Sequence, residues 1–248
     1  MLLNDLSDYI ASLMQISQFT DHCPNGLQVE GREEVRRIAT GVTASQNVLD
    51  SAIEWGADAI LVHHGYFWRN EDAAIAGIKK KRIARLLCND VSLLTYHLPL
   101  DAHSELGNNA QLGKLLGLVE QGRFGEQNIA WMGSLQQVQT LGQFTRQVAN
   151  ALNREPQVIG DAAMTLQKVA WCTGGAQGYF EAAIAQGVDA YITGEISEQN
   201  FHLAQESGVA FVAAGHHATE RLGIQALGEH LAIRFGLEHC FFDQPNPI

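Results

Sequence analysis

Short apolar runs that stop at glycine or polar residues recur along this chain and predict buried strands. One such run, Ala57–Val62, stops at the doublet His63-His64. Another run begins at Val209 and stops at the doublet His216-His217. Segments with helical spacing of apolar residues lie between the runs, at 73–89, 107–116, 140–152, 197–207 and 218–235. This alternation of strands and helices predicts an α/β fold with mainly parallel sheets.

An internal repeat accounts for part of this pattern. Residues 39–64 align without gaps with residues 170–195. The identical positions include Gln46 and Gln177, Gly56 and Gly187, Asp58 and Asp189, and Ala59 and Ala190. Each copy is typical of a strand, a helix closed by the glycine, and a second, buried strand. A gap-free match of this length favours duplication over a chance likeness between two β-α-β units.

The repeat predicts two α/β domains in one chain. The polar stretch Gln121–Gln127 contains two glycines and is the best candidate for the boundary between them. We therefore predict a first domain over residues 1–126 and a second domain over residues 127–248. The prediction allows the C-terminal segment, with a last strand at 239–243, to pack back on the first domain.

The charge and the cysteines narrow the class of protein. The net charge of −11 argues against non-specific binding to nucleic acid or to an anionic membrane. The N-terminus carries early acidic residues, and no apolar run reaches the roughly 18 residues that a membrane span needs. The four cysteines lie far apart, without Cys-x-x-Cys spacing, and indicate buried free thiols in a reducing compartment. We therefore expect a cytoplasmic protein.

Residues that can bind a metal ion follow the predicted strands. They are His63, His64, His97 and Asp101 in the first half of the chain, and His216 and Glu220 in the second half. Open α/β sheets bind their ligands at the carboxyl ends of the strands. Two histidine doublets and two carboxylates at such ends are hard to explain by packing alone, so they indicate a metal site.

The spacing allows these side chains to converge. Neighbours on a regular strand point to opposite faces, so His63 and His64 converge only if the strand ends there. Gly65 permits that break. His216 and Glu220 are four residues apart at a predicted helix start, so they share one face of that helix.

The donor set indicates the kind of metal. Asp101 lies in a predicted loop just past Pro99. Together with His63, His64, His216 and Glu220 it forms a set of three imidazoles and two carboxylates. This mixture, which contains no thiolate, suits Zn, Mn, Fe, Co or Ni better than Ca or Mg. Five ligands exceed what one tetrahedral ion takes from protein, and a carboxylate such as Glu220 can bridge two ions about 3.5–4 Å apart. We therefore expect two divalent ions, with ligands from both halves of the chain.

A glycine-rich segment offers an alternative site. Residues 173–178, with the sequence Thr-Gly-Gly-Ala-Gln-Gly, follow a strand and open a helix, which is a favourable setting for an anion. The segment matches neither of the glycine-rich patterns that bind nucleotide phosphates. Close packing of the helix on the sheet explains its glycines equally well.

Several motifs together resemble those of the GTP cyclohydrolase 1 type 2 homolog family, the NIF-three-like proteins, and in particular its bacterial YbgI-type members. The motifs are D-H-C-P-N-G-L-Q-V-E-G at 21–31, H-H-G at 63–65, H-L-P-L-D at 97–101, T-G-E at 193–195 and G-H-H-A-T-E at 215–220. The likeness covers essentially the whole chain. It implies two interlinked α/β domains, a dinuclear metal centre and a ring-shaped homohexamer.

The resemblance also assigns residues. Carried over motif by motif, the metal ligands are His63, His64, Asp101, His216 and Glu220, the same five that the spacing indicates. The resemblance further implies that Asn25–Gln28 is a structured loop near the site, a segment for which the residues alone suggest no chemistry.

The leading hypothesis is a metal-dependent hydrolase with two divalent ions and a small-molecule substrate. His97 and Glu195 are the candidates for proton transfer or for orienting the ligands. The family name suggests a nucleotide or related heterocycle, although no residue selects one. The alternative is a metal-binding ring assembly with an interaction or metal-handling role and no turnover. A nucleic-acid binder is a third hypothesis, and the acidic balance argues against it.

Overall fold

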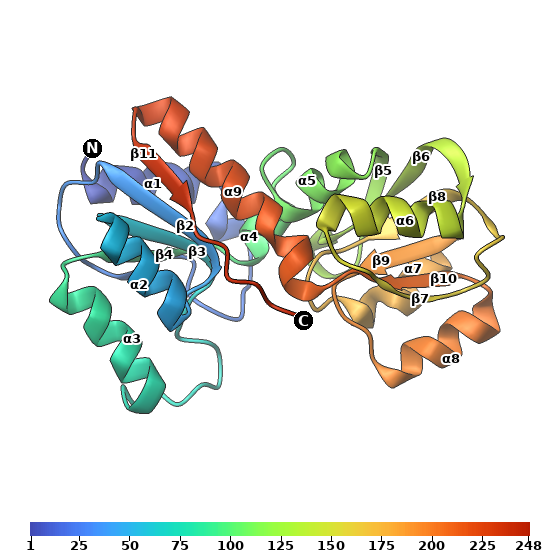
Figure 1. Cartoon of the computed structure of the whole chain (residues 1–248), viewed down its shortest axis with the longest axis horizontal. Coiled ribbons are helices and arrows are strands. Elements are labelled where there is room, and N and C mark those ends of the chain that lie inside the picture. The colour runs from blue at the N-terminus through green and yellow to red at the C-terminus, as the bar shows by residue number, and fades with distance from the viewer. The chain divides into compact units, whose positions relative to one another are not determined.

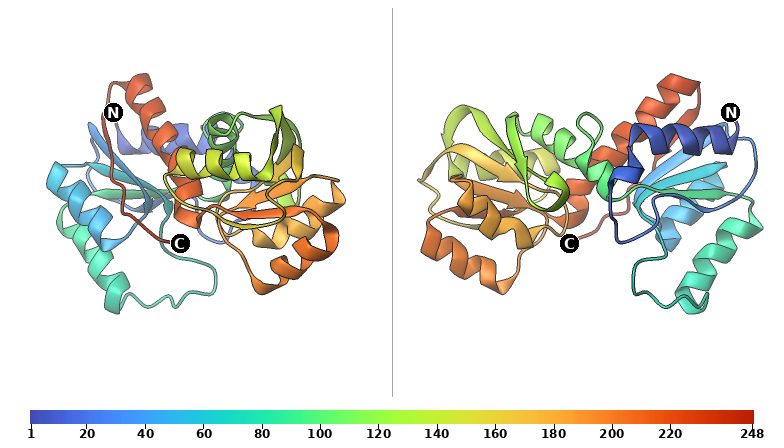
Figure 2. Two further views of the ribbon diagram at one scale, coloured as in Figure 1. Left: turned by 45° about the vertical axis from the view of Figure 1, so that its right-hand side comes forward. Right: turned by 180° about the vertical axis from the view of Figure 1, so that it is seen from behind.

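A computed structural model describes the whole chain, residues 1–248. The chain forms two compact units. Unit 1 consists of Met1–Gly107 and Gly223–Pro245, and unit 2 consists of Asn108–Leu222 and Asn246–Ile248. Each unit has one sheet with helices on both of its faces (Figures 1 and 2). The predicted α/β fold class is therefore confirmed.

The sheet of unit 1 has five strands in the order β1-β4-β3-β2-β11. They are β1 (Gly26–Val29), β2 (Arg37–Thr43), β3 (Ala59–His64), β4 (Ser92–Thr95) and β11 (Glu238–Phe241). The four strands from β4 to β11 are parallel, and only β1 is antiparallel, at one edge. Because β3 and β4 are parallel neighbours, their carboxyl ends lie at the same end of the sheet.

Helices cover both faces of this sheet. They are α1 (Leu3–Leu13), η1 (Ile16–Gln18), α2 (Gln46–Trp55), α3 (Gly77–Cys88), α4 (Leu98–Ala102) and the second part of α9 (His216–Phe235). Leu61 of β3 packs in the apolar cluster that contains Leu6 of α1. Its neighbours Ile60 and Val62 pack in the opposite cluster, with Leu49 of α2. The strand is apolar on both faces because helices bury both.

The sheet of unit 2 is mixed. Its order is β5-β6-β8-β9-β10-β7. The strands are β5 (Leu118–Phe124), β6 (Ala130–Thr140), β7 (Gln157–Ile159), β8 (Thr165–Trp171), β9 (Ala190–Thr193) and β10 (Ala210–Ala213). Only the central strands β8, β9 and β10 are parallel to one another. The other pairings are antiparallel, so the parallel arrangement predicted for this half is limited to the repeat and the strand that follows it.

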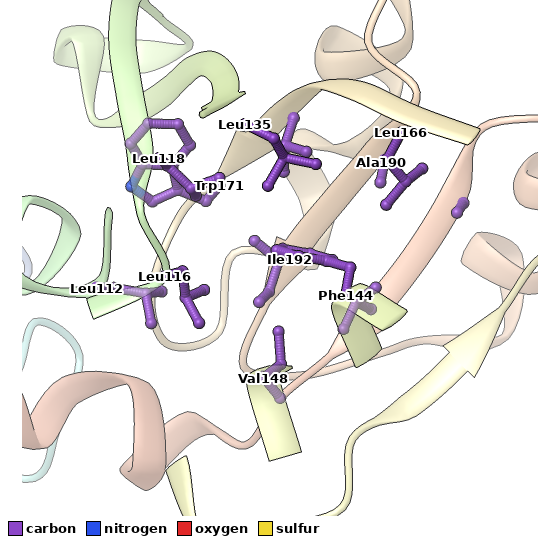
Figure 3. Packing of buried hydrophobic residues seen from close by; sticks show 14 of the residues in the cluster. Leu112, Leu116, Leu118, Leu135, Phe144, Val148, Leu166, Trp171, Ala190 and Ile192 are labelled. Carbon is purple, nitrogen blue, oxygen red and sulfur yellow. The ribbon is translucent and has the colours of Figure 1, made fainter. Parts of the chain in front are cut away.

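Unit 2 also has helices on both faces of its sheet. They are α5 (Asn108–Leu115), η2 (Glu126–Asn128), α6 (Leu141–Leu152), η3 (Gln177–Tyr179), α7 (Phe180–Ala185), α8 (Glu198–Ser207) and the first residues of α9. Phe144 and Val148 of α6 belong to the same apolar cluster as Ile192 and Trp171 of the sheet (Figure 3). The N-cap residue of helix α6 is Thr140, which forms a capping box with Gln143.

The structure differs from the sequence-based expectations at a polar stretch, at Asp101 and at the cysteines. Most of the polar stretch Gln121–Gln127 forms the end of strand β5 and the start of η2. Asp101 lies on the short helix α4, because Pro99 occupies the first turn of a helix, where its missing N–H costs nothing. All four cysteines are free thiols as predicted, but only Cys23 and Cys172 are buried, since Cys88 is exposed and Cys240 is half-buried. None of the helices has the length and apolar character needed to cross a bilayer.

Candidate metal centre

His63 and His64 end strand β3 in unit 1, and their rings lie close together. Their centroids are 4.6 Å apart. The Nδ1 atom of the buried His63 lies 2.9 Å from the carbonyl oxygen of Tyr96, so it donates its hydrogen there. The Nδ1 atom of His64 lies 3.2 Å from the Thr43 hydroxyl. Because both Nδ1 atoms have protein partners, Nε2 is the ring nitrogen that each residue presents to a ligand.

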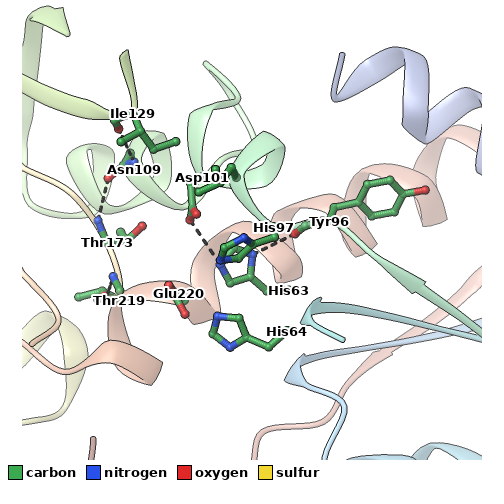
Figure 4. A network of polar contacts seen from close by, with 12 residues as sticks. His63, His64, Tyr96, His97, Asp101, Asn109, Ile129, Thr173, Thr219 and Glu220 are labelled. Atoms are coloured by element: carbon green, nitrogen blue, oxygen red, sulfur yellow. Dashed lines mark hydrogen bonds and ion pairs between the residues drawn. The ribbon is translucent and has the colours of Figure 1, made fainter. Parts of the chain in front are cut away.

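Asp101 completes a donor pair with His63 inside unit 1. Its Oδ1 atom lies 3.5 Å from Nε2 of His63 (Figure 4). Both side chains are almost fully buried, with exposed fractions of 8% and 0%. A carboxylate oxygen and an imidazole nitrogen that are both buried and lie side by side are ligands suited to a divalent cation. Helix α4 therefore delivers Asp101 to the end of β3.

Gly65 serves this site by its small size. Its φ angle is not positive, so the residue is not needed for an unusual backbone conformation. A Cβ atom there would collide with the side chains of Thr95 and Gln28. The Gln28 side chain receives a hydrogen bond from Tyr66 N at 2.7 Å and donates one to Tyr66 O at 3.0 Å. The segment Asn25–Gln28 is not the predicted loop, because Gly26–Gln28 belong to strand β1, but it does lie near His64: Gln28 holds the chain directly after that residue.

In unit 2, His216 and Glu220 form the corresponding donor pair. They lie in the first turns of α9, with His216 Nε2 and Glu220 Oε2 3.1 Å apart. The predicted shared helical face is therefore confirmed. Burial lowers the pKa of His216, but hydrogen bonds and charges from Glu220 and Glu195 outweigh it and raise the pKa to about 9. The two carboxylates stabilise the protonated, positively charged imidazole, so the surroundings of His216 favour a cation.

Glu195 contacts the ring nitrogen of His216 that is not beside Glu220. Its Oε1 atom lies 2.6 Å from Nδ1 of His216, and its Oε2 atom receives a hydrogen bond from Gln177 at 3.3 Å. A carboxylate on the far nitrogen of a ligand histidine fixes the tautomer and raises the basicity of the ring. The contact matches the orienting role that was one of the two predicted for Glu195.

The glycine-rich segment of unit 2 makes room for these same residues. Gly174 has φ +72°, and a Cβ atom there would collide with the Glu220 carboxylate and crowd the His216 ring. A Cβ atom at Gly194 would collide with the backbone of His216. The amide of Gly174 donates to the Thr219 hydroxyl at 3.0 Å, so it is already used within the protein. Close approach to the start of α9 explains these glycines better than a phosphate loop does.

His97 stands beside the two histidines of unit 1. Its ring centroid is 5.1 Å from that of His63 and 5.7 Å from that of His64. Ligand nitrogens of the three residues all lie within 4.8 Å of one another. A second cluster of Asp21, Cys23 and His97 has the same spacing. It is a poor metal site, because burial and the Asp21 charge raise the pKa of Cys23 to about 12 and keep the thiol protonated.

The sequence reasoning assigned no role to Asp21. Its side chain lies 2.7 Å from Nδ1 of His97 and accepts a hydrogen bond from Leu98 N at 2.9 Å. These contacts join residues more than seventy positions apart. The one sequence feature that pointed to Asp21 and Asn25 was their place in the D-H-C-P-N-G motif. That motif has no helical or strand periodicity from which a contact with His97 could be predicted.

The fold and these donor clusters define an α/β protein with residues suited to metal binding at the ends of its strands. The family model for Duf34/NIF3 (NGG1p interacting factor 3) matches residues 1–247. The chain therefore belongs to the Duf34/NIF3 family.

Relatives and solved structures agree with this assignment. The protein named GTP cyclohydrolase 1 type 2 homolog from Pseudomonas aeruginosa is 53% identical over 248 residues, covering 99% of this chain and 98% of the relative. The protein of the same name from Escherichia coli K12 is 49% identical over 244 residues, with 98% of each covered. The structure of the protein ybgI matches with a TM-score of 0.97, 48% identity and full coverage of both chains. The structure of TTHA1606 from Thermus thermophilus matches with a TM-score of 0.91, 32% identity and full coverage of both chains.

Proposed function

We propose that this protein is a hydrolase that uses two divalent metal ions. The proposed ligands are His63, His64, Asp101, His216 and Glu220. The observation that carries the proposal is the anchoring of all three ligand histidines through Nδ1, by Tyr96 O, the Thr43 hydroxyl and Glu195. Imidazoles held in this way present Nε2 in a fixed direction, which is how proteins prepare histidines for metal. Ions that accept mixed imidazole and carboxylate donors are Zn, Mn, Fe, Co and Ni.

The chain's own residues supply orientation and proton transfer. When bound, the ions supply Lewis-acid chemistry that polarises a substrate oxygen and activates water. His97 is the proposed proton-transfer residue because its imidazole lies beside both ligand histidines of unit 1. Glu195 orients His216 by accepting the hydrogen of Nδ1, which leaves Nε2 to face the metal.

The substrate and the assembly are further parts of the proposal. The relatives are named GTP cyclohydrolase 1 type 2 homolog, and this name supports a nucleotide or a related heterocycle as substrate.

We propose a ring-shaped homohexamer in the cytoplasm, on the resemblance alone. Size-exclusion chromatography with light scattering tests the hexamer, for which the expected mass is six times that of the 27.1 kDa chain.

Metal analysis and an activity screen test the central proposal. Purified protein is expected to hold close to two ions per chain after incubation with Mn, Zn, Fe or Co. Each metal form is then assayed against nucleotides, phosphoesters and small amides. Turnover should be lost in His63→Ala and kept in Glu34→Ala, which removes an exposed carboxylate.

The outcomes separate the alternatives. Bound metal without turnover across the panel would favour the metal-binding assembly. Well under one ion per chain, together with an unchanged His63→Ala variant, would remove the basis for both functions. Nucleic-acid binding that weakens steeply with salt would instead support the third hypothesis.

A further inference from the structure

The loop before β1 is built around the buried carboxylate of Asp21, whose side chain is 3% exposed. Its Oδ1 atom lies 2.7 Å from Nδ1 of His97 and accepts from His22 N at 2.6 Å. Its Oδ2 atom accepts from Leu98 N at 2.9 Å and from the Asn25 side chain at 2.8 Å. Two of these four contacts reach His97 and its neighbour, so the carboxylate is directed at the segment that carries His97.

Asn25 holds the same segment through the backbone. Its Oδ1 atom accepts from His97 N at 2.7 Å while its amide group donates to Asp21. The backbone of His97 is unusual, with φ −97° and ψ −106°, and lies directly before α4. Asp21 and Asn25 therefore fix both the ring and the backbone of one residue at the point where β4 gives way to a helix.

These contacts determine the protonation pattern of the His97 ring. Burial raises the pKa of Asp21, but hydrogen bonds from His97 and Asn25 and the charge of His97 outweigh it and lower the pKa to about 2. An ionised carboxylate only accepts hydrogen bonds, so Nδ1 of His97 must carry the hydrogen. In the neutral ring, Nε2 then has the lone pair. His97 is the one histidine near β3 whose Nδ1 partner is a carboxylate, since His63 and His64 use a carbonyl and a hydroxyl.

We infer that Asp21 and Asn25 are positioning residues for His97, which they hold as a proton carrier with its ring beside those of His63 and His64 and with the lone pair on Nε2. This inference rests on the proposed function for the role of the proton, but the positioning itself is independent of any substrate. It also assigns a purpose to the loop 21–25, which the ligand set leaves unexplained.

The state of the His97 ring tests the positioning directly. Protein with ¹⁵N-labelled histidine is loaded with Zn²⁺, and the His97 signals are identified by their loss in His97→Gln. We expect hydrogen on Nδ1 in the unaltered protein. Asp21→Asn should raise the ratio of the Nε2–H to the Nδ1–H form on the order of tenfold, because a charge-assisted hydrogen bond is lost. Glu34→Gln is the matched control, since it makes the same chemical change at an exposed carboxylate.

Kinetics on any substrate found in the screen tests the proton-carrying role. Asp21→Asn should lower kcat about 10- to 100-fold, with KM and metal content unchanged. The double variant Asp21→Asn/His97→Gln should be no slower than His97→Gln alone, because Asp21 acts through His97. Multiplying losses, or reduced metal content in Asp21→Asn, would overturn the proton-carrying role.

The tautomer measurement separates failure of this inference from failure of the proposed function. If no substrate is turned over, the proposed function fails while the ring measurement still decides the positioning. Unchanged His97 signals in Asp21→Asn overturn the inference. If that variant does not fold, Asn25→Ala decides in its place: it keeps the carboxylate and should shift the ratio in the same direction by about threefold. No shift there overturns the inference equally.

Discussion

Within each unit, one aspartate holds the strands of its own repeat in the same way: Asp58 in unit 1 and Asp189 in unit 2. Asp58 Oδ2 accepts from Arg36 N at 2.8 Å and Arg37 N at 2.9 Å. Asp189 Oδ2 accepts from two successive amides, of Gln167 and Lys168, both at 2.8 Å. In each unit, the carboxylate directly before the second strand of the repeat thus binds two successive amides at or next to the first strand, at the start of β2 in unit 1 and within β8 in unit 2.

The repeats differ where the second strand ends. Strand β3 ends in His63-His64, whereas the aligned residues in unit 2 are Gly194-Glu195. Unit 1 places its proposed ligand histidines on the strand, and unit 2 places His216 on the helix that follows the next strand. The two copies therefore share a scaffold but use different elements to present imidazoles. The two copies keep the hydrogen bonds that hold their strands and differ at the strand ends.

The largest expected effect distinguishes the two carboxylate ligands. Under the proposed function, Glu220 bridges two ions and Asp101 binds one. Glu220→Ala should therefore lower the metal content from two ions to below one per chain, and turnover should fall on the order of 100-fold or more. Asp101→Ala should leave about one ion. Metal analysis after dialysis measures both contents. Equal losses in the two variants would show that Glu220 is not a bridge.

The partners of the ligand histidines should differ in importance. His216 has the Glu195 carboxylate on Nδ1, whereas His64 has only the Thr43 hydroxyl at a longer distance. Glu195→Gln should weaken metal binding about 10- to 100-fold, and Thr43→Val should weaken it only a few-fold. Competition with a coloured chelator measures both affinities. A larger effect of Thr43→Val would contradict the unequal roles assigned to the two units.

The sequence predicted the scaffold better than the supports of the site. The repeat and its capping glycines located α2, β3 and β9, because periodicity and turn residues are local signals. Helix α4 was missed because its five residues are too few to show helical periodicity. The link from Asp21 to His97 was missed for another reason: it is a hydrogen bond between distant loops, which leaves no periodic trace.

The two structural aspartates should contribute similarly to stability. Asp58→Ala and Asp189→Ala each leave two backbone amides without their acceptor, at a cost of about 2 kcal/mol. The melting temperature should fall by roughly 4–8 °C in each variant. Asp58→Ala should fall slightly more, because Asp58 also pairs with Arg32 at 2.9 Å. Calorimetry measures both, with Glu34→Ala as the exposed control. A loss confined to one aspartate would mean that the repeats no longer share this support.

The smallest expected effect concerns the glycines after α2 and α7. Gly56 and Gly187 have φ angles of +86° and +65°, which favour glycine over any residue with a Cβ atom. Alanine at either position should cost about 1 kcal/mol and lower the melting temperature by roughly 2–4 °C. Gly56→Ala should cost slightly more, because its Cβ would lie 3.1 Å from the Arg37 guanidinium while Gly187 has open space. Gly178→Ala is the matched control, since that glycine has open space and no positive φ. If Gly178→Ala destabilised the protein as much as the other two, the left-handed backbone could not be the reason for the repeated glycine.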